Sequence, residues 1–143
     1  MTNHRLKLIT TQDGSHSLMR EDMNETYHSF HGAVGESSYV FIEKGLEWCH
    51  QQESSKEIGV FEVGFGTGLN AYLAAKFAME KKCHITFYSV EPIPVSADLY
   101  AQFNYGKTSE DQALLQKLHE AKWGELAVVH SHFFLAKHET TLE

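Results

Sequence analysis

A buried strand that runs directly into three closely spaced glycines is the feature that most constrains this chain. Residues 58–63 form an apolar run typical of a buried strand, and glycines follow at positions 64, 66 and 68. From Leu69 to Lys82, apolar residues recur at the spacing of one helix face. The segment therefore predicts a strand, a glycine-rich turn and a helix whose first N–H groups are free to bind a ligand.

The alternation of strands and helices continues after this unit. Residues 85–90 are rich in strand formers, and the prolines at 92 and 94 must end that strand. A capping-box pattern opens a helix at Ser109, and residues 126–130 form a third apolar run. This order predicts an α/β fold with a parallel sheet and a ligand at the carboxyl ends of its strands. No fourth strand is expected.

The N-terminal part is predicted to be an extension packed on the core. Residues 1–45 are expected to be β-rich or irregular, with strands at residues 5–10 and 17–19, and residues 46–143 are expected to form the core. Residues 37–50 are compatible with a helix, although Gly45 disfavours one continuous piece. A length of 143 residues fits a single domain overall.

The spacing of the glycines separates two classes of cofactor. A dinucleotide fingerprint, G-x-G-x-x-G, requires glycine at position 69, which is Leu69 here. The pattern that begins at Glu62 is acid-x-G-x-G-x-G, the form seen in class I methyltransferases that use S-adenosylmethionine. Glu91, at the end of the second core strand, is then positioned to accept hydrogen bonds from both ribose hydroxyls. The expected fold is the N-terminal β-α-β-α-β part of such a Rossmann-like methyltransferase.

Three segments carry a resemblance to a known family. Residues 62–70 read EVGFGTGLN, residues 31–42 read HGAVGESSYVFI, and residues 89–94 read SVEPIP. Together they resemble the tRNA 5-methylaminomethyl-2-thiouridine methyltransferases, either the methyltransferase domain of MnmC or the stand-alone MnmD type. The resemblance covers about residues 10–130. It implies methyl transfer from S-adenosylmethionine to the amine of 5-aminomethyluridine, often 2-thiolated, at the tRNA wobble position.

The resemblance also implies that Glu36 and Ser37 line the cofactor pocket. The full set of predicted cofactor-binding residues is Glu36, Ser37, Glu62, Gly64, Phe65, Gly66, Thr67, Gly68, Leu69, Asn70, Glu91 and Pro92. No catalytic residue is predicted, because the family's acidic motif beside the reacting amine is expected beyond Glu143. Relative to the family the chain is interpreted as truncated, with cofactor binding retained and turnover lost. The sheet edge left open predicts a possible homodimer.

Several histidines and one aromatic cluster have more than one interpretation. His130 and His132 lie on one strand face, but no third ligand follows at a recognisable spacing unless His138 folds back, so no metal is expected. In methyltransferases an acid often meets the adenine amine after the third strand, and His132 stands in that place here. His28 and His31, which lie near Tyr27 and Phe30, either stack on a nucleobase or, as we favour, belong to an amphipathic loop that packs on the domain.

Net charge and hydropathy limit the remaining functions. A formal charge of −7, from 12 Lys and Arg against 19 Asp and Glu, disfavours broad binding of a polyanion, and tRNA would need a local patch. No apolar run is long enough to span a membrane and no signal peptide is recognisable, so no membrane partner and a cytoplasmic location are expected. Two alternatives stay open: an NAD(P)-dependent oxidoreductase domain, and a non-catalytic module that binds a partner through its open sheet edge.

Overall fold

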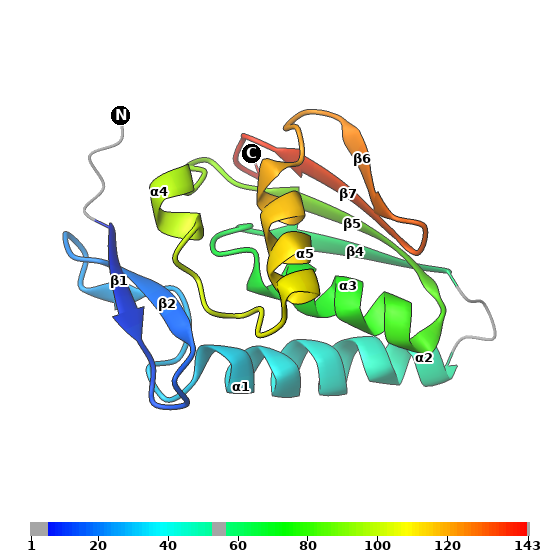
Figure 1. Ribbon diagram of the computed structural model, residues 1–143, viewed down its shortest axis with the longest axis horizontal. Helices are drawn as coiled ribbons and strands as arrows, with labels where there is room; N and C mark the ends of the chain where they lie inside the picture. Colours follow the sequence, from blue (N-terminus) through cyan, green and yellow to red (C-terminus); the bar gives the residue numbers. More distant parts are fainter. Residues whose placement is uncertain (1–5, 53–56, 143) are drawn as a thin grey trace.

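The computed structural model describes residues 6–52 and 57–142, which form a mixed α/β arrangement with two sheets (Figure 1). Arg5, the first residue of the expected N-terminal strand, lies outside the described residues. The strands are β1 (Leu6–Thr10), β2 (His16–Arg20), β3 (Glu25–Thr26), β4 (Glu57–Val63), β5 (His84–Val90), β6 (Leu126–His130) and β7 (Phe133–His138). The helices are α1 (Ala33–Ser37), η1 (Ser38–Glu47), α2 (Trp48–Gln52), α3 (Leu69–Lys81), α4 (Ala97–Tyr100) and α5 (Ser109–Glu120).

The N-terminal strands form an antiparallel sheet of their own, in the order β1-β2-β3. The turn between β1 and β2 also caps the first helix. Three N–H groups of α1 donate to side chains of that turn: Ala33 N to Thr11 Oγ1 (3.1 Å), Val34 N to Ser15 Oγ (3.0 Å) and Gly35 N to Asp13 Oδ2 (2.9 Å). Because the first N–H groups of a helix have no intrahelical acceptor, these bonds fix where α1 begins.

The helical run after the cap is longer than the sequence indicated. α1, the π-helical stretch η1 and α2 follow one another without a break from Ala33 to Gln52, so the run begins before residue 37 and continues through Gly45. The run begins at Ala33 because side chains of the β1–β2 turn cap it there. Helical periodicity in the sequence does not reveal a cap that comes from residues so far upstream. The run also crosses the predicted boundary between the N-terminal extension, residues 1–45, and the core, residues 46–143. That boundary remains a prediction.

The second sheet has four strands in the order β4-β5-β7-β6. β4 pairs with β5 and β5 with β7 in parallel, whereas β6 pairs with β7 antiparallel. The expectation that residues 126–130 supply the third parallel strand, with no fourth strand, is therefore wrong. β6 and β7 form a hairpin, and its tight turn at Ser131 and His132 lacks the Gly, Asn or Asp that signals such turns in sequences.

One face of this sheet carries the helices (Figure 1). Phe87 of β5 meets Phe41 of η1 edge-on, with ring centroids 6.3 Å apart, and Lys137 of β7 reaches the end of α5. In α3, Leu69 and Phe77 are buried as their helical spacing predicted. α5 begins where expected, but its cap is Thr108, whose Oγ1 accepts from Asp111 N at 3.0 Å. Because α3 begins directly after the glycine-rich turn and α5 packs beside it, the turn lies next to the hydrophobic core.

Candidate functional site

The glycine-rich turn joins the carboxyl end of β4 to the first turn of α3. Gly64, Gly66 and Gly68 have positive φ values of 91°, 53° and 77°. At Gly68 a Cβ would lie 2.9 Å from His119 Nε2, and at Gly66 it would lie 3.2 Å from the Tyr27 ring. Both positions combine a left-handed backbone with a close neighbour, so glycine is required there.

α5 and the segment before it hold this turn from behind. His119 Nε2 donates to the carbonyl oxygen of Thr67 at 2.8 Å, and burial lowers the pKa of His119 to about 4, so the imidazole is neutral near pH 7. The Tyr105 hydroxyl lies 3.1 Å from Thr67 Oγ1. Phe65 is buried with its ring 5.4 Å from that of His119. The turn is therefore fixed by packing before any ligand arrives.

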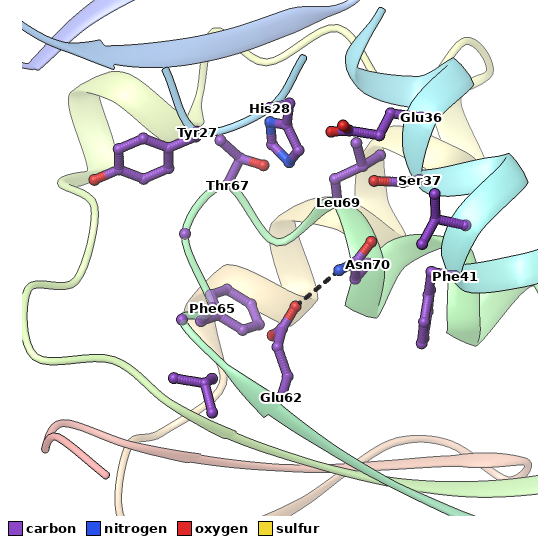
Figure 2. Close-up of a pocket in the computed structure, with 14 residues that line it drawn as sticks. Tyr27, His28, Glu36, Ser37, Phe41, Glu62, Phe65, Thr67, Leu69 and Asn70 are labelled. Atoms are coloured by element: carbon purple, nitrogen blue, oxygen red, sulfur yellow. Dashed lines mark hydrogen bonds between the residues drawn. The ribbon is translucent and has the colours of Figure 1, made fainter. Parts of the chain in front are cut away.

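A pocket of about 330 Å³ opens in front of the turn, a size within the usual range for small-molecule sites. The turn and β4 form one side, α1 and η1 a second, and the segment after β3 a third (Figure 2). Its lining residues are Tyr27, His28, Glu36, Ser37, Val40, Phe41, Glu62, Val63, Gly64, Phe65, Gly66, Thr67, Leu69 and Asn70.

The pocket brings together most of the residues that the sequence indicated. The exceptions are Gly68, Glu91 and Pro92, which do not line it. Glu91 is buried, and its carboxylate accepts from Gly66 N (2.8 Å) and Ile93 N (3.2 Å), so it fastens the turn to the end of β5. Pro92 is exposed.

The remaining lining residues were not among the expected site residues: Tyr27, His28, Val40, Phe41 and Val63. Part of this set had a signal in the sequence, because Val40 and Phe41 lie one helical turn beyond Glu36 and Ser37. The rings of residues 27–31 stood out in the sequence, but no local pattern places Tyr27 and His28 in this pocket, because their position depends on how the N-terminal sheet packs.

Glu62 and Asn70 form the polar floor of the pocket. Glu62 Oε1 accepts from Ser89 Oγ at 2.8 Å, and its Oε2 accepts from Asn70 Nδ2 at 3.2 Å. Burial raises the pKa of Glu62 to about 7. Asn70 Oδ1 is buried without a hydrogen-bond partner among the described residues. A buried acceptor without a donor is costly, and here it lies beside a carboxylate in a ligand-sized pocket.

The charge of the pocket has one sign. Of the described residues that line it, Glu36 and Glu62 carry carboxylates and none is lysine or arginine. Phosphate groups are usually bound by such cations or by helix N-termini, whereas carboxylates favour a ligand with a positive group. Asn70 Oδ1 is an acceptor without a donor, so it also favours a ligand whose positive group carries N–H donors.

The histidines at the β6–β7 turn lie far from this pocket. Ile85 N, at the start of β5, donates to His132 O at 2.9 Å, so His130 and His132 lie at the amino ends of the parallel strands. The glycine-rich turn lies at their carboxyl ends, and the placement of His132 beside the adenine amine is therefore wrong. Within residues 6–52 and 57–142, no group of three His, Cys, Asp or Glu is arranged to hold a metal. No helix in this part of the chain is long and apolar enough to cross a membrane.

The fold and the pocket define an α/β protein with a ligand-sized pocket at a glycine-rich turn that follows a parallel strand. No family model matches the chain. It is similar to the tRNA 5-methylaminomethyl-2-thiouridine biosynthesis bifunctional protein MnmC of Campylobacter hominis, with 31% identity over 103 residues. It is also similar to the crystal structure of MNMC2 from Aquifex aeolicus, with a TM-score of 0.70 and 26% identity. The chain belongs to the MnmC-type family.

The matched regions cover different shares of each protein. The Campylobacter match spans 71% of this chain but only 15% of that protein. The Aquifex match spans 94% of this chain and 42% of that chain. The chain therefore spans less than half the length of each of these relatives.

Proposed function

We propose that this chain binds S-adenosylmethionine in the pocket at the glycine-rich turn, as the cofactor-binding part of a Rossmann-like, class I tRNA methyltransferase. The Campylobacter protein is bifunctional by name, so family membership does not decide which activity this segment serves. The glycine spacing and the acidic pocket favour S-adenosylmethionine over a dinucleotide, because a pyrophosphate would face Glu36 and Glu62 without a lysine or arginine among the described lining residues.

The buried oxygen of Asn70 is the observation that carries this proposal. Asn70 Nδ2 donates to Glu62, which fixes the amide so that Oδ1 is the atom left without a donor. An ammonium group supplies up to three donors and pairs with a carboxylate. The methionine part of S-adenosylmethionine carries such a group, so Glu62 and Asn70 Oδ1 would hold it together.

Other parts of the site fit the rest of the cofactor. The first N–H groups of α3 would receive the methionine carboxylate. Glu91 would accept from the ribose hydroxyls, because a carboxylate has about four lone-pair sites and two N–H bonds leave some of them open. Since β7 is the third parallel strand, the acidic position for the adenine amine moves from His132 to Glu139, which follows β7 directly. Pro92 would close the turn beside Glu91.

The proposed reaction is methyl transfer to the amine of 5-aminomethyluridine, with or without 2-thiolation, at the wobble position of tRNA. The cofactor supplies an electrophilic methyl group when bound. The name of the Campylobacter relative, which refers to 5-methylaminomethyl-2-thiouridine biosynthesis, supports this substrate class. tRNA as the partner and the cytoplasm as the location belong to the same proposal.

Calorimetric titration tests the cofactor. We expect the folded chain to bind S-adenosylmethionine, and Glu62→Gln to weaken binding about tenfold or more, because hydrogen bonds to charged groups contribute about 1.5–3 kcal/mol. Glu57→Gln, at the other end of β4, is the matched control and should bind like the unchanged chain. Binding of NAD in place of S-adenosylmethionine, or no heat with either on folded protein, would overturn the proposal.

A further inference from the structure

We infer that the segment after the N-terminal sheet is part of the ligand site, with Tyr27 and His28 forming a wall that contacts the bound ligand. The inference rests on the proposed function and extends it to residues outside the glycine motif and outside the three segments that carry the family resemblance. Both residues line the pocket: Figure 2 shows His28 across from Glu62, between Thr67 and Glu36, and Tyr27 beside the glycine-rich turn.

Tyr27 lies directly against the glycine-rich turn. Its ring lies close to Gly66, where an added Cβ would be 3.2 Å from Tyr27 Cδ2 and would press against the ring. Burial raises the pKa of Tyr27, and the negative charge of Glu91 adds to this effect, so the phenol stays neutral and lies near that carboxylate. A flat neutral ring beside the turn is suited to packing on an organic ligand that the turn binds.

His28 is held in one orientation by a buried neighbour. Its Nδ1 lies 2.8 Å from Ser17 Oγ, and Ser17 of β2 is fully buried. The other ring nitrogen, Nε2, is not used in this contact, and the ring points into the space between Thr67 and Glu36 (Figure 2). Burial lowers the pKa of His28, so the imidazole offers the pocket one uncharged hydrogen-bonding group.

The sheet next to this wall is anchored to two other segments through residues 11–16. Asp13, Thr11 and Ser15 bind the start of α1, which carries Glu36 and Ser37. Asn104, in the segment before α5, accepts from His16 N and donates to Gly14 O, both at 2.9 Å. The wall is therefore in place before the ligand binds, and preorganised contacts contribute to affinity because little ordering is left to do.

Binding measurements on variants of residues 27 and 30 test the wall. We expect Tyr27→Leu to weaken binding of S-adenosylmethionine about tenfold or more, since a buried aromatic contact is lost, and Tyr27→Phe to stay within about threefold. Phe30→Leu is the matched control, because Phe30 is an exposed aromatic of the same segment that does not line the pocket. Urea unfolding of each variant verifies that it is folded.

Nuclear magnetic resonance provides a readout that does not depend on a folded variant. On titration of the unchanged chain with S-adenosylhomocysteine, we expect the His28 ring signals to shift and those of His31, an exposed histidine of the same segment, to stay. If the unchanged chain binds but Tyr27→Leu binds equally well and the His28 signals do not move, the wall is refuted and the proposed function stands. If the unchanged chain binds neither ligand, the proposed function fails first.

Discussion

The two faces of the four-stranded sheet differ in what covers them. On one face the apolar residues are buried under α3, α5 and η1: Ile58, Ile85, Phe87, Phe133 and Leu135. On the other face apolar residues are exposed to solvent by 44% to 64%: Phe61, Val63, Tyr88, Leu126 and Val128. Parallel sheets are normally covered on both faces, and both faces here have the corresponding apolar character. One face therefore stabilises the chain, whereas the other is free for association.

The largest expected effect comes from neighbouring residues of β5 that point to opposite faces. Phe87 is fully buried between Phe41 and Phe133, whereas Tyr88 is 44% exposed on the open face. Phe87→Ala should lower the free energy of unfolding by about 3–5 kcal/mol, and Tyr88→Ala by less than about 1 kcal/mol. Urea unfolding of both variants measures the difference. Equal losses would show that the open face is covered in solution.

A second prediction concerns the charge buried on the covered face. Lys137 is 1% exposed, and its Nζ donates to the carbonyl oxygens of Leu118 (2.9 Å) and His119 (2.8 Å) at the end of α5. Lys137→Ala removes these bonds and leaves a cavity, so it should lower the free energy of unfolding by about 2–4 kcal/mol. Lys137→Met keeps most of the volume and should cost less. If the two variants cost the same, the hydrogen bonds carry the effect and the packing does not.

Glu62 provides a prediction at the rim of the covered face, where the core becomes the pocket. Burial raises its pKa from 4.5 to about 7. The folded chain therefore keeps the Glu62 proton at pH values at which the unfolded chain has already released it. This contribution to stability is full below about pH 4.5 and is lost as the pH rises through about 7, amounting to about 3 kcal/mol.

The Glu62→Gln variant isolates this contribution. The free energy of unfolding of the unchanged chain should fall relative to Glu62→Gln between pH 5 and pH 7 and then level off. Urea unfolding at several pH values, without ligand, measures the difference. A difference that does not depend on pH would show that Glu62 is ionised in the folded chain, with water reaching it from the pocket.

The parts of the fold that depend on local sequence could be predicted. The glycine-rich turn and its flanking strand and helix follow from periodicity, since β4 and α3 are adjacent along the chain. Most of the expected pocket residues come from this unit and lie together as expected, although the cofactor that they bind is still a proposal. An open sheet edge was also expected, although not on which strand, and in the described sheet β4 is an edge strand.

The parts that depend on distant packing could not be predicted. The turn before β7, at Ser131 and His132, has no Gly, Asn or Asp to signal a hairpin in the sequence. The third parallel strand was therefore assigned to β6, which placed the expected adenine position at the wrong end of the sheet. Tyr27 and His28 are held by Leu18 and Ser17 of β2, and the β1–β2 turn binds the start of α1, which forms another side of the pocket. Such contacts join segments that are distant along the chain, and hydrophobic periodicity within one segment carries no information about them.

The smallest effect on stability, and the sharpest test of the open face, comes from charges placed on β4. Phe61 and Val63 are 59% and 64% exposed on an edge strand, so Phe61→Lys with Val63→Lys should change the free energy of unfolding by less than about 0.5 kcal/mol. Unpaired edge strands with apolar surface favour self-association, and inserted lysines oppose it. In sedimentation velocity we expect the unchanged chain to form dimers as its concentration rises, and the double variant to stay monomeric.

Tyr39→Lys is the control, because it removes an exposed aromatic residue from η1 and leaves the sheet unchanged. This variant should dimerise like the unchanged chain. If Tyr39→Lys were monomeric, the dimer contact would lie away from the sheet.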